Sequence, residues 1–100
     1  MSKLTLNYCK QQTMAVCKMK GWDKVDVANI WMYLVEEIGE LAGAIRRGLH
    51  QFQDRKRTSI QSEIMDVLSY LFQIAHDFDI DLDAAWVEHM KRQEAHASKT

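Results

Sequence analysis

The sequence predicts an all-α fold, a helical bundle of about four helices, from three observations. Proline is absent from the 100 residues and only four are glycine, so few positions exclude a helix. No segment alternates apolar and polar residues strictly enough to indicate a strand. Apolar side chains recur instead at helical spacing, and the clearest stripe runs through Ile30, Leu34, Ile38, Leu41 and Ile45.

Glycines and capping residues predict the ends of the first two helices. The first is expected over residues 4–20, where Gly21 ends it. The second is expected over residues 26–47, between a capping aspartate, Asp23 or Asp26, and the last glycine of the chain.

Polar and capping residues predict the rest of the chain in the same way. Residues 49–58 carry no apolar period and are expected to form the main loop. The Thr-Ser pair at 58–59 is a good N-cap for a third helix over residues 60–78. Asp81 or Asp83 then caps a fourth helix that runs toward the polar C-terminal tail.

Composition and charge exclude several classes of protein. The chain is 47% hydrophobic and 27% charged, which is typical of a single soluble globular domain. Thirteen Lys and Arg against fourteen Asp and Glu leave a net charge of -1, so no basic field attracts nucleic acid. No apolar run approaches the roughly 18 to 20 residues that span a bilayer, and the N-terminus lacks the pattern of a secretory signal. We therefore expect a cytoplasmic protein that binds neither nucleic acid nor membrane.

The two cysteines are predicted to be reduced thiols. Cys9 and Cys17 lie on one predicted helix, about 12 Å apart along its axis, which is too far for a disulfide. A zinc site is not indicated either, because the four histidines are scattered along the sequence.

Two predicted helices each carry a pair of acids at spacing i and i+3. Glu37 and Glu40 lie at the polar edge of the apolar stripe of the second helix. Glu63 and Asp66 occupy the same angular positions on the third. If these helices pack as antiparallel neighbours, the four carboxylates meet in one cleft.

Four carboxylates in one cleft repel one another unless some are protonated or a divalent cation lies between them. Oxygen-only ligands suit Mg²⁺ or Mn²⁺, and Mg²⁺ prefers phosphate oxygens as further ligands. The bland alternative is a solvated acidic face, which is the usual role of helix acids. Two matched pairs favour a site, and neither the helix dipole nor local basic partners explain Glu36, Glu37 and Glu40, which lie in mid-helix. A metal site that takes a phosphate or diphosphate ester is therefore favoured.

These residues also carry a family resemblance. The segments 36–41 (EEIGEL) and 63–68 (EIMDVL) resemble the EExxE…ExxD pattern of the MazG-like all-α nucleoside triphosphate pyrophosphohydrolases. The resemblance covers roughly residues 21–86 and implies one such domain over residues 1–100. It also implies hydrolysis of a nucleoside triphosphate to the monophosphate and pyrophosphate, with a part in nucleotide-pool house-cleaning.

The resemblance assigns roles to individual residues. It implies that Mg²⁺, or Mn²⁺ in its place, is bound by the four acids of the two pairs, and that Glu36 orients or deprotonates the attacking water. It places a base-stacking side chain at Trp22, a substrate contact at Tyr70 and a phosphate contact at Lys91 or its neighbour Arg92. Gln12 is a further candidate from the residues themselves, because its amide can hydrogen-bond a base edge.

Some alternatives stay open at the level of the sequence. Phosphoribosyl-ATP and dUTP pyrophosphohydrolases are relatives with similar acid patterns, so the substrate is one open alternative. The other is that the protein is not an enzyme but a helical interaction module. The basic residues Arg46, Arg47 and 55–57 flank the connection between the two acidic helices and are either phosphate contacts or a solvated cluster. Small residues at Gly39 and Gly43, with Met32 and Met65 on comparable flanks, indicate a self-association face. The resemblance accordingly implies a homodimer or a homotetramer.

Overall fold

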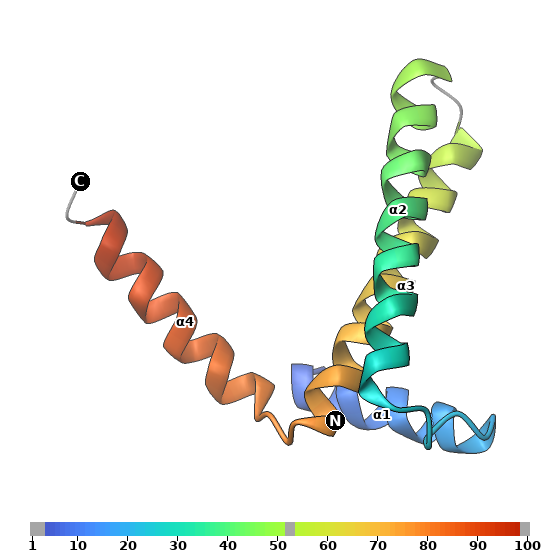
Figure 1. The fold of residues 1–100 in the computed structure, drawn as a ribbon. Coiled ribbons are helices and arrows are strands. Elements are labelled where there is room, and N and C mark those ends of the chain that lie inside the picture. Colours follow the sequence, from blue (N-terminus) through green and yellow to red (C-terminus); the bar gives the residue numbers. More distant parts are fainter. Residues whose placement is uncertain (1–3, 52–53, 99–100) are drawn as a thin grey trace.

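The computed structural model describes residues 4–51 and 54–98, without the side chains of residues 48–58, and its backbone forms four helices (Figure 1). They are α1 (Leu6–Met19), α2 (Val27–Gln51), α3 (Asp54–Asp77) and α4 (Leu82–Ala97). No strand occurs among these described residues. The predicted all-α fold of four helices is therefore confirmed.

The predicted main loop between the second and third helices is wrong. Helix α2 continues through Gly48 to Gln51, and α3 already begins at Asp54, so only residues 52–53 of the predicted loop lie outside the described part of the chain. The pair 58–59 lies inside α3 and does not cap it. A missing apolar period does not break a helix, and one glycine costs only about 1 kcal/mol of helix propensity. This stretch also has no proline, the residue that most strongly disfavours a helix interior.

Helices α2 and α3 form a long antiparallel hairpin, and α1 lies across its open end against α3 (Figure 1). Most of the core lies at this end, where Ile30 and Leu34 of the predicted stripe, Cys17 of α1 and Ala75 of α3 are buried. Farther along the hairpin the stripe is less covered, since Ile38 is 47% exposed and Ile45 is 40% exposed. The single chain thus buries the predicted stripe only in part.

Helices α1 and α3 end in the same hydrogen-bond motif. Past the end of α1, Gly21 has a φ of +74° and the Trp22 N–H donates back to the Cys17 carbonyl at 2.8 Å. Past the end of α3, Asp79 has a φ of +54° and the Ile80 N–H donates to the carbonyl of residue 75 at 2.9 Å. Both are Schellman motifs, which reverse the chain directly after a helix. The first of them fixes where Trp22 leaves α1.

Helix α4 is attached to the rest of the chain by reciprocal capping with α1. The Asp83 carboxylate accepts from the Leu6 N–H at 2.9 Å, and the Asn7 side-chain oxygen accepts from the Leu82 N–H at 2.8 Å. The Asn7 amide also donates to Asp81, the N-cap of α4, at 2.8 Å and lowers the pKa of that carboxyl. The first turn of each helix thereby supplies a hydrogen-bond acceptor for a backbone N–H at the start of the other helix. Beyond this junction α4 extends away from the hairpin (Figure 1).

Replacing Asn7 with alanine tests the reciprocal caps. The change removes the acceptor for the Leu82 N–H and the donor to Asp81, so we expect the free energy of unfolding to fall by about 1 kcal/mol. Asn29→Ala is the matched control, because Asn29 lies in the first turn of α2 and its side chain makes no hydrogen bond with another described residue. Urea denaturation followed by circular dichroism measures both variants, and equal losses of stability would contradict the capping role.

Candidate metal and nucleotide site

Three of the predicted acids meet where α2 and α3 face each other. Glu37 projects from α2, while Glu63 and Asp66 project from consecutive turns of α3. One carboxylate oxygen from each lies within 4.8 Å of the others. Glu37 and Glu63 are half-buried and Asp66 is exposed, so the cluster opens to solvent on one side. The i and i+3 spacing on α3 is what brings both of its acids to the same face of the hairpin.

The two half-buried carboxylates lack hydrogen-bond donors. The Oε2 atoms of Glu37 and Glu63 are buried and have no hydrogen-bond partner among the described residues. Burial, followed by a hydrogen bond with Glu63 and then by the charges of Glu40, Glu63 and Asp66, raises the pKa of Glu37 to about 7. Two carboxyl groups share a hydrogen bond only if one of them holds a proton. Without a cation, the pair is therefore accommodated by protonation.

The donor set suits a hard divalent cation. All the available ligand atoms are carboxylate oxygens, which Mg²⁺ and Mn²⁺ prefer and zinc does not. A cation would supply the positive charge that the orphaned oxygens of Glu37 and Glu63 lack. The cluster of Glu37, Glu63 and Asp66 is thus consistent with a divalent metal site.

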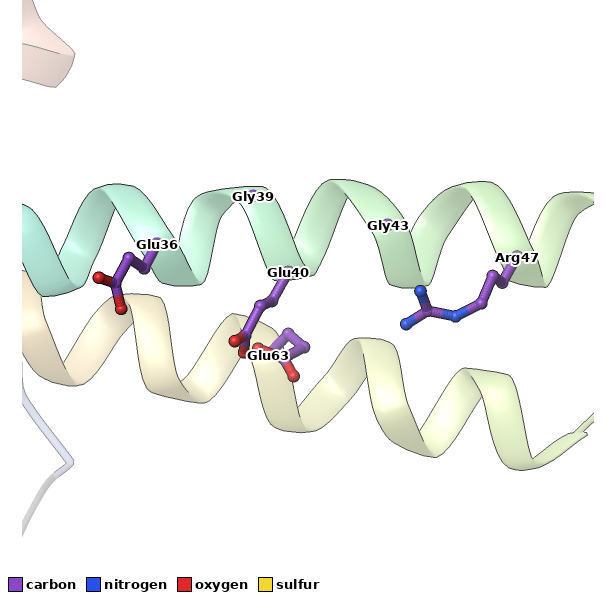
Figure 2. Close-up of a pocket in the computed structure, with 6 residues that line it drawn as sticks. All are labelled: Glu36, Gly39, Glu40, Gly43, Arg47 and Glu63. Atoms are coloured by element: carbon purple, nitrogen blue, oxygen red, sulfur yellow. The ribbon is translucent and has the colours of Figure 1, made fainter.

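An open cavity of about 660 Å³, here called the acid cavity, adjoins this cluster. Glu36, Glu40 and Glu63 line it, and Figure 2 shows the first two projecting from α2 and the third from α3. The Arg47 side chain reaches back from the next turns of α2 toward these acids (Figure 2). A Cβ at Gly43 would lie 3.2 Å from the Arg47 Nη1 atom, so the glycine leaves room for the guanidinium. The cavity therefore has acids at one end and a cation at the other.

A second cavity of about 600 Å³, here called the central cavity, extends from the acids to α1. Glu37 and Asp66 line it together with Gln12, Trp22 and Tyr70. It meets a smaller cavity of about 260 Å³, here called the aromatic pocket. The walls of the aromatic pocket come from the α1–α2 connection and from facing turns of α2 and α3, through Trp22, Val25, Ile30, Tyr33, Tyr70 and Gln73.

Neighbouring side chains hold the aromatic rings in place. The Lys20 ammonium lies 4.6 Å from the ring centroid of Trp22, within the range of a cation–π contact. The rings of Tyr33 and Tyr70 are 6.1 Å apart between centroids and tilted by 41°. Burial, with the charges of Glu37 and Asp66, raises the pKa of Tyr70, so its hydroxyl stays protonated and able to donate.

The structure brings together most of the residues predicted from the sequence. The three acids of the cluster are in contact range, Glu36 and Glu40 line the acid cavity, and Gln12, Trp22 and Tyr70 line the central cavity. Lys91 is exposed on α4 and lines none of these three cavities. Its role as a phosphate contact stays a prediction. The side chains of residues 55–57 lie outside the described part of the structure.

Tyr33 and Gln73 are among the cavity-lining residues that the sequence does not predict, whereas Arg47 is predicted only as one of several basic residues near the connection between the acidic helices. Helical spacing is the signal that points to them. Tyr33 is one turn before Glu37, and Gln73 is seven residues after Asp66 on the same face of α3. Arg47 is seven residues after Glu40, but nothing in its charged segment sets it apart from the neighbouring basic residues.

The raised pKa of Glu37 predicts how stability depends on pH in EDTA. The folded carboxyl titrates near 7 and the unfolded one near 4.5, so the native state holds more protons between these values. The free energy of unfolding should therefore fall as pH rises from about 5 to about 8. Glu37→Gln should flatten this dependence, whereas Glu88→Gln on the exposed face of α4 should keep it. Urea titrations across this range measure the slopes, and parallel curves for Glu37→Gln and the parent would contradict the prediction.

Comparison with known proteins places the site in a family. The family model described as the MazG nucleotide pyrophosphohydrolase domain matches residues 26–97. The matched residues contain Glu37, Glu40, Glu63 and Asp66, and they leave out α1 and Trp22. No curated protein matches the chain. No helix of the described residues is long and apolar enough to cross a membrane. The family model spans most of the sequence, and the chain belongs to the MazG nucleotide pyrophosphohydrolase domain family.

Proposed function

We propose that the protein hydrolyses ribo- or deoxyribonucleoside triphosphates to monophosphates and pyrophosphate, with Mg²⁺ or Mn²⁺ as cofactor. The observation that carries the proposal is the cluster of Glu37, Glu63 and Asp66, within 4.8 Å of one another, inside a MazG domain. Glu40, which lines the acid cavity with Glu63, completes the ligand set. Removal of non-canonical or excess nucleotides is the role that suits this reaction.

The chain's own residues account for the remaining chemistry. A bound divalent cation neutralises phosphate charge and lowers the pKa of water. Glu36 is exposed at the acid cavity, where its carboxylate accepts the proton of a water whose oxygen attacks the α-phosphorus. The bond from that phosphorus to the bridging oxygen breaks, and pyrophosphate leaves with the electron pair.

The order of residues along α2 supports one orientation of the substrate. Tyr33 lies in the aromatic pocket and Arg47 at the far end of the acid cavity, about 20 Å apart along the helix axis. The acids lie between them. In this orientation the base occupies the aromatic end, the phosphates cross the acids, and the Arg47 guanidinium faces the leaving pyrophosphate.

Turnover of a panel of nucleoside triphosphates, with Mg²⁺ and with EDTA, tests the proposal. We expect monophosphate and pyrophosphate only with the metal. Asp66→Asn and Glu63→Gln should each lower kcat/KM by at least about 100-fold, because they remove ligands and not merely the groups that orient them. Glu88→Gln on α4 is the control, since it lines none of the described cavities.

The panel also separates the related substrates. Activity confined to dUTP or to phosphoribosyl-ATP would move the proposal to those reactions. Unchanged turnover in Asp66→Asn and Glu63→Gln would refute the metal site. No turnover of any substrate would favour a non-catalytic interaction module.

We also propose that the protein assembles as a homodimer or homotetramer. The support is the exposed apolar face of α2, on which Trp31, Met32 and Val35 are all at least half exposed. These side chains recur at helical spacing and have no cover within the described chain. A second copy of this face is a suitable partner for it.

Light scattering after size exclusion tests the assembly. The mass should be at least twice the 11.7 kDa of one chain. Met32→Glu places a charge on the exposed face of α2 and should lower the mass toward that of one chain. Met19→Glu at the end of α1 is the matched control, because Met19 is 85% exposed and lies away from this face. A monomeric parent would contradict the proposal.

A further inference from the structure

The side-chain amide of Gln73 is largely buried but makes only one hydrogen bond with the described part of the chain. Gln73 is only 8% exposed on α3. Its Nε2 donates to the Ser69 carbonyl, one turn earlier, at a long 3.3 Å. Its side-chain oxygen and its second N–H make no hydrogen bond with other described residues. Gln73 lines both the central cavity and the aromatic pocket, so a ligand there is able to pair with these two groups.

Gln73 lies where two cavities share a wall. Among the described residues, Trp22, Tyr70 and Gln73 alone line both the central cavity and the aromatic pocket. The central cavity continues from this wall to Glu37 and Asp66. A ligand in the aromatic pocket therefore has flat rings beside it, an amide in the same wall, and the acids within the adjoining cavity.

The chemistry of this wall fits a planar heterocycle with donors and acceptors at its edge. Indole and phenol rings stack on any nucleobase without selecting one. The Gln73 amide adds one free acceptor and one free donor, which is the complement of a base edge. Because its Nε2 donates a hydrogen bond to the Ser69 carbonyl, the amide is held in one orientation. The positions of its free oxygen and its free N–H are therefore fixed relative to each other and to the pocket.

We propose that Gln73 reads the edge of the nucleobase and determines which base the protein accepts; the inference rests on the proposed function. A largely buried amide discriminates more strongly than an exposed one, because a bound base displaces the water at the pocket wall and a base without the matching groups leaves the amide unpaired. Gln12, the other amide in the central cavity, is exposed, so water replaces any bond that a base fails to make. Gln73, and not Gln12, therefore sets the preference.

Steady-state kinetics on all canonical nucleoside triphosphates test the proposal. Gln73→Met keeps the side-chain length and removes both hydrogen-bonding groups. We expect this variant to have a kcat/KM for the preferred nucleotide about tenfold below that of the parent. The ratio of this kcat/KM to the values for the other nucleotides should fall as well. Gln73→Glu replaces the donor with an acceptor and should change the order of the bases. Gln12→Met should leave the order unchanged, as should Gln11→Met, an exposed glutamine of α1 that lines none of the described cavities.

A second readout does not depend on turnover. Binding of the nucleoside monophosphates in EDTA, followed by tryptophan fluorescence, should show the same base preference in the parent and lose it in Gln73→Met. Inhibition of turnover by inorganic tripolyphosphate should be equal in both proteins, because that ligand has no base. A folded Gln73→Met that keeps the parent's order of bases in both readouts would overturn the inference, as would a parent that binds every monophosphate equally.

The two readouts separate this inference from the proposed function. A parent that turns over no triphosphate but binds monophosphates selectively refutes the reaction and leaves Gln73 to be judged on binding alone. A parent that turns over triphosphates with a base preference untouched by both Gln73 variants refutes the role of Gln73 and leaves the reaction standing.

Discussion

The contact between Glu37 and Glu63 across the α2–α3 interface is the constraint on which the rest of the structure depends. While both are ionised, these two half-buried carboxylates repel each other, so without a proton or a cation this point of the hairpin opposes the packing of its own helices. The buried apolar side chains of α2 lie on both sides of the acids, with Ile30 and Leu34 toward α1 and Ala44 farther along the hairpin. Long uninterrupted helices are therefore needed to carry the acids on a scaffold that is stabilised elsewhere.

The helices and the acids are predictable from the sequence, because both depend on local spacing. Helical periodicity indicates the fold class, and the matched i and i+3 pairs identify Glu37, Glu63 and Asp66. The Asp81 cap of α4 is one of two predicted alternatives, and the structure selects it. The end of α2 differs from the prediction because a polar composition alone does not stop a helix, and no residue there breaks one.

Features that depend on contacts between distant segments are not predictable in this way. The reciprocal caps join Asn7 to residues 81–83, and neither segment reveals the other. Gln73 resembles any helical glutamine until α1 and the Trp22 turn cover it. Arg47 is one of several basic residues in its segment, and only the space above Gly43 distinguishes it. Local patterns therefore identify the chemistry, whereas the fold decides which further side chains surround it.

The Schellman motif at Gly21 has a consequence for how such a protein diversifies. Trp22 directly follows α1 and lies outside the residues that the family model matches. All four acids lie on the α2–α3 hairpin, within the matched residues. Of the three described residues that line both the central cavity and the aromatic pocket, Trp22 lies outside the hairpin, whereas Tyr70 and Gln73 lie on α3 with Glu63 and Asp66. Substitutions in α1 or in its terminal turn therefore change the position of the Trp22 ring without moving a carboxylate, so this side of the pocket is free to vary while the acids stay in place.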